Sequence, residues 1–157
     1  MKHRVLFAAF VAALILAGCA PSAQGTRSNP FDLRHDRTVT TTRASTSYVL
    51  VAFDHGAFGY DVRDLSGRWI PWGVDGAAAT VTPLFSLRDL VGPDGWNLDV
   101  QGVRAFDLPG RRGVAIEATL RLDVPAGARP GGPRLRAVLE ARNGHSQPFE
   151  IIVHVVP

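Results

Sequence analysis

The sequence predicts an all-β protein whose main domain is a single antiparallel β-sandwich. Residues 114–124 alternate between apolar and polar side chains, and the same alternation returns in residues 135–141 and 149–155. A period of two places one face of a strand on a core and the other face in water. Glycines and prolines separate these runs, as they do in turns, and no helical period longer than about two turns occurs in the domain.

The start of the chain has a composition of its own. Lys2 and Arg4 precede an apolar run over residues 5–16, and the run ends in Leu-Ala-Gly-Cys, in which Cys19 is the only cysteine of the chain. A charged start, a short apolar segment and small residues before a cut are typical of a secretory signal. The run is shorter than the roughly 20 apolar residues that a membrane-spanning helix requires.

The motif at residues 16–19 resembles the lipobox of bacterial lipoproteins, which is cut just before its cysteine. The resemblance implies that residues 1–18 are a removed signal peptide. It also implies that mature Cys19 carries a thioether-linked diacylglycerol and, on its amine, an acyl chain such as palmitate. The protein is then lipid-anchored in the bacterial cell envelope, with the membrane as a partner. Because Ala20 rather than aspartate follows, the resemblance favours the outer membrane in a bacterium with two membranes.

Residues 19–37 are predicted to be the lipidated cysteine and a flexible linker, because they are polar, broken by prolines and without a sustained period. A flexible chain of this length averages roughly 20–25 Å end to end, which lets the domain sit away from the membrane. The alternative is that Phe31, in the sequence Asn-Pro-Phe, docks on the domain.

The β-sandwich domain is predicted to span residues 38–157. Residues 47–53 are rich in β-branched and aromatic side chains, as strands are. Residues 86–91 are expected to form a short helical turn. Gly and Pro breaks at intervals of roughly ten residues favour two packed sheets with about seven to nine strands in all. The other segments that permit a strand are residues 58–64, 69–74, 77–81 and 96–108.

The turns at residues 125–132 and 143–148 predict that the last three strands are antiparallel neighbours joined by tight connections. Residues 120–155, with Val-Pro-Ala-Gly-Ala-Arg-Pro-Gly between two alternating runs, resemble the final strands of bacterial immunoglobulin-like domains, including NEW3-type and fibronectin-like modules of surface proteins. The resemblance implies an immunoglobulin-like sandwich. The sequence departs from that pattern in one respect, because Pro133-Arg134-Leu135 replaces the tyrosine usual after the turn.

The sequence carries no recognisable catalytic motif: it has no G-x-S-x-G, no H-E-x-x-H, no phosphate-binding loop and no dinucleotide glycine pattern. A lipidated Cys19 leaves no free thiol, which excludes a disulfide, a thiolate metal site and a cysteine nucleophile. In Asp54-His55-Gly56, His55 is a candidate general base, although its neighbours are ordinary turn residues. We therefore predict no catalytic residue and no cofactor.

Two groups of polar residues are candidates for a metal site, and neither predicts one. Glu150 and His154 lie on one face of a strand, where a cross-strand ion pair is the ordinary explanation. Asp94, Asn97 and Asp99 are rich in oxygen atoms, but their spacing does not fit a calcium-binding loop.

Aromatic side chains are the remaining candidates for a binding surface. Trp69 and Trp72 form a compact group around Pro71, and Trp96 and Tyr60 are further candidates. Burial in the core is one explanation of these side chains. An exposed platform for a sugar ring or a partner protein is the other.

The charge pattern argues against nucleic acid as a partner. The formal net charge of +3 includes Lys2 and Arg4, which leave with the signal peptide, and the other charges are scattered without a basic block. The sequence predicts a non-catalytic interaction module that binds another envelope or secreted protein through strand edges or loops. The alternative is a glycan- or peptidoglycan-binding module that uses exposed tryptophans. A third hypothesis is that the protein is an enzyme with a site near His55.

Overall fold

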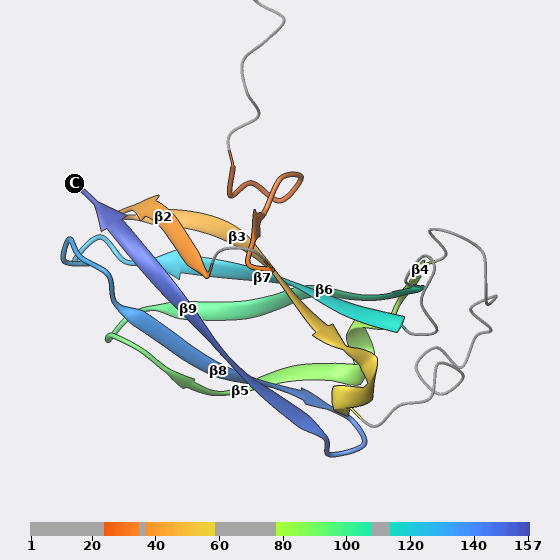
Figure 1. Cartoon of the computed structure of the whole chain (residues 1–157). Coiled ribbons are helices and arrows are strands. Elements are labelled where there is room, and N and C mark those ends of the chain that lie inside the picture. Colours follow the sequence, from red (N-terminus) through yellow and green to blue (C-terminus); the bar gives the residue numbers. More distant parts are fainter. Residues whose placement is uncertain (1–23, 35–36, 59–77, 108–113) are drawn as a thin grey trace, which may run out of the picture.

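The computed structural model describes residues 24–34, 37–58, 78–107 and 114–157. In these residues the chain forms strands and two short 3-10 helices, η1 (His55–Phe58) and η2 (Thr82–Leu84). The strands make two sheets that face each other across a common apolar core (Figure 1). The all-β prediction is therefore confirmed.

The first sheet has five strands in the order β1-β3-β7-β6-β4. Its three long inner strands pair antiparallel, and the register of β6 against β7 shifts between Val100 and Gly102. The strands are β1 (Phe31–Asp32), β3 (Ser45–Asp54), β7 (Val114–Val124), β6 (Asn97–Asp107) and β4 (Ala78–Thr80).

The second sheet has four strands in the order β2-β9-β8-β5. Its inner pair, β8 and β9, is an antiparallel hairpin, and β5 continues the antiparallel pairing on the far side of β8. The strands are β2 (Thr38–Thr42), β9 (Ser146–Val156), β8 (Arg134–Ala141) and β5 (Phe85–Val91).

The expectation of purely antiparallel sheets is wrong at two edges. Strand β1 pairs parallel to β3, and β2 pairs parallel to β9. Between β1 and β3 the chain passes through β2 in the other sheet, so it returns to the first sheet running in the same direction. A direct hairpin, by contrast, would have forced antiparallel pairing. The first sheet is mixed for this reason, and the second sheet is mixed because β2 pairs parallel to β9.

The last three strands form where the alternation predicts them, but they do not lie in one sheet. Strand β7 belongs to the five-stranded sheet, whereas β8 and β9 pair in the other. Residues 125–133 carry the chain across. They begin with a turn in which the Ala128 N–H donates to the Pro125 carbonyl at 3.1 Å, and Ala128 itself is buried. Alternation identifies which face of a strand is buried, but it does not say which sheet the strand joins.

Residues 86–91 are strand rather than helical turn. They belong to β5, which pairs with β8 through Phe85 opposite Ala141 and Leu87 opposite Leu139. Phe85 is buried and Leu87 partly so, because alternate residues of the strand face the core. The pairing becomes irregular after Arg88, where Asp89 takes a positive φ of 53°.

Residues 24–34 lie against the domain instead of forming a flexible linker. Phe31 sits in β1 and packs against the core, which is the docking alternative for that residue. The Tyr48 N–H donates to the Gly25 carbonyl at 2.8 Å. Packing of the Phe31 ring against the edge of the core removes apolar surface from water, and this burial stabilises the docked segment.

The core follows the predicted strand registers. In β7 the alternate residues Ile116, Leu120 and Leu122 are fully buried, and Leu135 and Ile151 are equally buried in β8 and β9. Four aromatic rings meet through three edge-to-face contacts, Phe53 with Phe58, Phe53 with Phe149, and Phe58 with Phe85.

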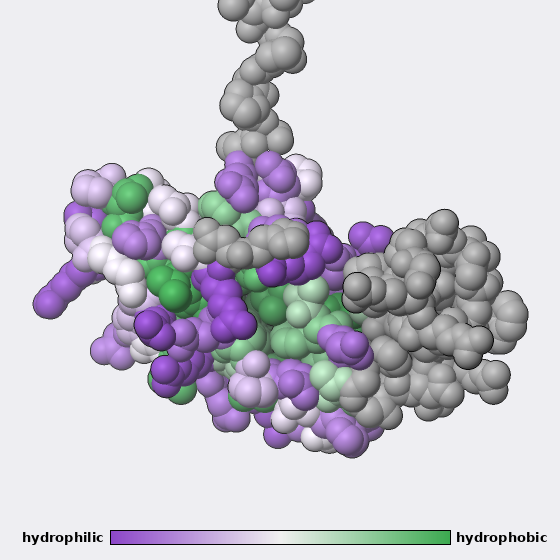
Figure 2. All heavy atoms as spheres, viewed as in Figure 1, coloured by the Kyte–Doolittle hydropathy of each residue, from purple (hydrophilic) through white to green (hydrophobic). Residues whose placement is uncertain are grey.

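Hydrophilic residues cover most of the described surface in Figure 2, and an apolar area shows in the middle of this face. A hollow of about 330 Å³ lies between β3 and β9, lined by Val51, Phe53 and Phe149 together with Arg34 and Arg37. The short strands β1 and β2 do not extend far enough to cover this part of the gap between the sheets.

Candidate functional site

Of the predicted lipidation site and the four aromatic binding candidates, only Trp96 lies in the described part of the chain. Cys19, Tyr60, Trp69 and Trp72 fall outside the described residues. Trp96 immediately precedes β6, and its half-buried indole packs against the core while one side stays open to solvent.

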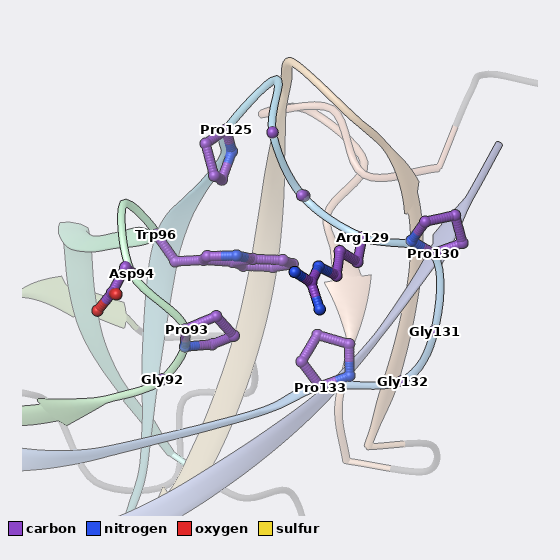
Figure 3. A pocket seen from close by; sticks show the side chains of 12 residues that line it. Gly92, Pro93, Asp94, Trp96, Pro125, Arg129, Pro130, Gly131, Gly132 and Pro133 are labelled. Carbon is purple, nitrogen blue, oxygen red and sulfur yellow. The ribbon is translucent and has the colours of Figure 1, made fainter.

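The open side of Trp96 faces a hollow of about 750 Å³ at one end of the two sheets. One wall is the turn between β5 and β6, which contributes Pro93 and Asp94. The other is the crossing segment between β7 and β8, which contributes Pro125, Arg129 and their neighbours. Figure 3 shows the indole edge-on between Pro125 and Pro93, with the Arg129 side chain at its far end.

Both walls are held by backbone geometry. In the β5–β6 turn the Trp96 N–H donates to the Pro93 carbonyl at 3.3 Å, and Gly95 supplies the positive φ of 79° that the turn requires. On the other wall Gly131 pairs with Val155 through two backbone bonds, of 2.9 and 3.3 Å.

Four prolines line the hollow, and each fixes its own φ. They are Pro93, Pro125, Pro130 and Pro133. A surface whose backbone is fixed in advance loses little conformational entropy when a ligand binds, which favours affinity.

The polar groups of the hollow are charged. Arg129 and Asp94 are both exposed, and in the described part of the chain neither forms an ion pair. A guanidinium without a carboxylate partner is available to an incoming carboxylate or phosphate, which it can hold with two parallel N–H donors.

The exposed large apolar side chains of the described residues gather near the same end. Leu90 and Val91, which are 40% and 63% exposed, close β5 just before Gly92 and Pro93 of the hollow. Val156, 37% exposed, follows the residue that pairs with Gly131. Apolar groups next to an aromatic hollow mark a surface suited to binding.

Most of this site is not predicted by the sequence. Trp96 is a candidate because it is aromatic, whereas residues 125–132 predict only a turn. The density of prolines around Arg129 in that segment is the signal that the sequence offers. The sequence does not show that this segment lies beside Trp96, because that proximity arises where the chain crosses from one sheet to the other.

Glu150 has arginine partners in place of a metal ion. Glu150 is held by two arginines of β8, with Arg136 Nε at 2.8 Å and Arg134 Nη1 at 2.9 Å, so the cross-strand ion pair is the observed arrangement. The hydrogen bond from Arg136, with the charge of both arginines, lowers the pKa of Glu150. The described residues contain no group of three side chains able to hold a metal ion.

The other local groups lie at the ends of strands and at the start of η1. The Asn97 side-chain amide donates to Asp99 at 2.7 Å, which is a contact along the start of β6. Asp54 ends β3 and His55 begins η1.

Comparison with protein-family models returns no match, and comparison with curated proteins returns none either. Within the described ranges there is no helix of the length and apolarity needed to cross a membrane.

Proposed function

We propose that this chain is a lipid-anchored protein of the bacterial cell envelope, held by Cys19, whose β domain is a non-catalytic module that binds another envelope or secreted protein. The anchor is supported by the Leu-Ala-Gly-Cys motif after a charged start and an apolar run. The binding role is supported by the hollow beside Trp96.

The proposal includes an immunoglobulin-like domain. In that fold one sheet has strands A, B, E and D, and the other has strands G, F and C. The strand orders β1-β3-β7-β6 and β2-β9-β8-β5 correspond to this arrangement, with the first strand divided between the two sheets. The extra strand β4 and the parallel pairing of β1 are departures from it.

A protein partner is favoured by the composition of the hollow. Tryptophan and arginine are the residue types most enriched among those that dominate binding energy, and Trp96 and Arg129 lie together here. Rigid prolines and the exposed Leu90 and Val91 extend the apolar surface beyond the hollow. We expect the partner to insert an apolar side chain against the indole and to bring an acidic group to Arg129.

The test is photo-crosslinking in cells, with a photoreactive amino acid at the exposed Val91 of the intact lipoprotein, followed by mass spectrometry. We expect one reproducible protein adduct that the variant Arg129→Ala reduces at least severalfold. Arg104→Ala is the matched control, because Arg104 is also exposed but lies on β6, outside the hollow. An adduct unaffected by Arg129→Ala and by Trp96→Ala would move the binding surface elsewhere.

A glycan is the second candidate, because the flat face of Trp96 has a carboxylate and a guanidinium beside it. Sugar rings stack on aromatic faces and present hydroxyls to such groups. Recovery of envelope polysaccharide without any protein adduct would support this function instead.

A further inference from the structure

The segment just after the lipobox is fixed to the domain by backbone hydrogen bonds. The Gly25 N–H donates to the Asn29 carbonyl at 2.8 Å, which closes a turn, and the Gly25 carbonyl accepts from the Tyr48 N–H. Farther along, the Leu33 N–H donates to the Leu50 carbonyl at 2.9 Å. Residues 24–34 therefore form a strap along the edge of the five-stranded sheet.

The strap depends on a close contact between Gly25 and Phe31. Gly25 is buried, has a φ of +87°, and a Cβ at this position would lie 2.4 Å from the Phe31 ring. The ring packs in turn against the core. Any larger residue at position 25 would therefore displace Phe31 or the turn.

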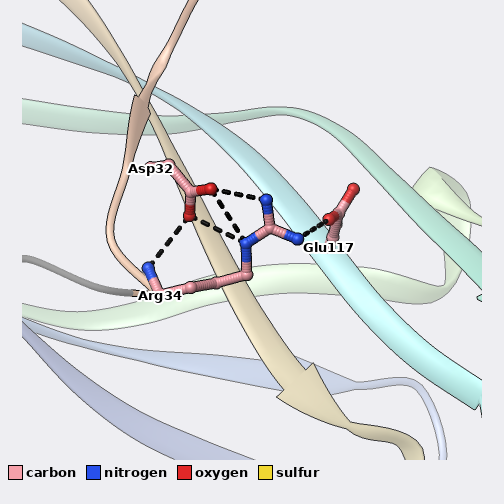
Figure 4. Close-up of polar contacts among 3 residues, drawn as sticks. All are labelled: Asp32, Arg34 and Glu117. Atoms are coloured by element: carbon pink, nitrogen blue, oxygen red, sulfur yellow. Dashed lines mark hydrogen bonds and ion pairs between the residues drawn. The ribbon is translucent and has the colours of Figure 1, made fainter. Parts of the chain in front are cut away.

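Polar contacts hold the other end of the strap (Figure 4). Arg34 Nε lies 2.9 Å from both carboxylate oxygens of Asp32, and Arg34 Nη1 reaches Glu117 of β7 at 3.1 Å. The Asp32 hydrogen bonds, with the charge of both carboxylates, raise the pKa of Arg34 above its usual range.

Docking of the strap shortens the chain available between the anchor and the domain. If the linker ran freely from Cys19 to Thr38, its greatest reach would be roughly 65 Å. From Cys19 to the docked Gly25 the greatest reach is about 20 Å. A domain of this size is wider than that, so the side that carries the strap must face the membrane.

The edge beside the strap carries exposed arginine side chains. Arg27 lies in the strap, Arg37 directly before β2, and Arg43 directly after it. In the described part of the chain none of the three takes part in an ion pair. Arginines at such a surface are attracted to anionic lipid headgroups.

The opposite edge includes β5, which carries the exposed apolar residues Leu90 and Val91. Strands β1 and β2 end the two sheets on one side, and β4 and β5 end them on the other. In Figure 1 the strap lies at the top of the molecule and β5 at the bottom. A domain held by the strap therefore turns Leu90 and Val91 of β5 away from the bilayer.

We propose that the edge formed by the strap and β2 lies against an anionic bilayer surface, so that the β5 edge and its exposed side chains face a partner. This inference rests on the proposed lipidation of Cys19. The domain then has a fixed orientation close to the membrane, whereas a long flexible linker would leave it free to rotate.

The test uses the mature lipoprotein in vesicles of phosphatidylglycerol and phosphatidylethanolamine with a nitroxide on some headgroups. A fluorophore is attached to one introduced cysteine, either Thr40→Cys on β2 or Ser86→Cys on β5, since both positions are exposed. Lipidated Cys19 has no free thiol to compete. We expect quenching at position 40 to exceed quenching at position 86 severalfold.

Two changes to the chain should remove the fixed orientation of the domain. Gly25→Val should release the strap and bring the quenching ratio close to one. Insertion of 20 Gly and Ser residues between Ala23 and Gln24 leaves the strap intact and should lower the ratio as well, so the test does not depend on Gly25→Val folding. Equal quenching at the two positions in the unaltered chain, or a ratio that the insertion leaves unchanged, overturns the inference.

The same preparation tests the lipidation of Cys19 separately from the orientation of the domain. Mass spectrometry shows whether the mature N-terminal peptide carries the mass of the diacylglycerol. If that mass is absent and the protein does not float with vesicles, both the lipid anchor and the proposed orientation are contradicted. Lipidated protein with equal quenching contradicts the orientation alone. Replacing all lipids with phosphatidylcholine should reduce the ratio, and an unchanged ratio would remove the anionic headgroups from the proposal.

Discussion

The hydroxyl oxygens of Thr41 and Ser47 lie 2.9 Å apart and join the two sheets, since Thr41 belongs to β2 and Ser47 to β3. They are the only polar side chains among the described residues that are buried. A buried hydroxyl without a partner costs more than the hydrogen bond itself gains. Thr41 also contacts the Ser45 hydroxyl at 2.8 Å, so it is Ser47 that depends on Thr41.

The first prediction concerns this pair. Thr41→Val removes one hydroxyl and leaves Ser47 buried without it, which should lower the free energy of unfolding by about 1–3 kcal/mol. Adding Ser47→Ala should restore part of that loss, because the unsatisfied group is then gone. Thr40→Val, on the exposed face of the same strand, is the matched control, and urea denaturation of each variant measures the coupling. Additive effects of the two substitutions would show that the hydroxyls are not coupled.

The second prediction tests the register of β7. Leu120 is fully buried and faces Val49 of β3 and Val100 of β6. Leu120→Ala should lower the free energy of unfolding by about 2–5 kcal/mol, through lost apolar burial and the cavity that remains. Leu90→Ala makes the same chemical change at a residue that is 40% exposed and should cost under about 1 kcal/mol. A thermal shift near zero for Leu120→Ala would refute the register.

The strands that were predicted correctly are those with a long local signal. In β7 the alternation over eleven residues identifies Ile116, Leu120 and Leu122 as core without reference to any partner strand. The parallel strands β1 and β2 have only two and five residues, which is too short for a period to appear. For β5, Ser-Leu-Arg-Asp-Leu-Val fits a helical turn as well as a strand, and its irregularity at Asp89 obscures the alternation.

The candidate site was less predictable than the fold, because its two walls are distant in sequence. Trp96 could be selected from its residue type alone. Arg129 could not, since its position beside Trp96 follows from residues 125–133 crossing between sheets. The sequence allows docking of Phe31 as an alternative to a flexible linker, but the requirement for glycine at position 25 depends on the folded geometry.

The third prediction concerns pH. Arg136 and Arg134 lower the pKa of Glu150 in the folded protein below its ordinary value of 4.5. The ionised carboxylate therefore stabilises the fold above that value, and this contribution is lost as the pH falls through the lower, folded pKa. Glu150→Gln should flatten the dependence of stability on pH in this acid range, as measured by urea denaturation at a series of pH values.

A matched control for the pH experiment is Asp94→Asn. It removes an exposed carboxylate that forms no ion pair within the described residues. Because Glu150 lies at the surface, salt should weaken the effect in the unaltered protein. A pH profile of Glu150→Gln that follows the unaltered protein would mean that the pair contributes nothing to acid stability.

The fourth prediction tests the anchor separately from the domain. Cys19→Ser removes the only thiol to which diacylglycerol can be attached, so the protein should become extractable from membranes by water. One acyl chain gives only marginal binding, whereas the two or three chains of a lipoprotein cysteine hold a protein almost permanently. The strap begins after Cys19, so its docking and the thermal stability of the domain should not change. If Cys19→Ser stays with membranes through detergent-free washing, the anchor is not at this cysteine. If the variant is released but its domain is less stable, the lipid contributes to the fold as well as to attachment.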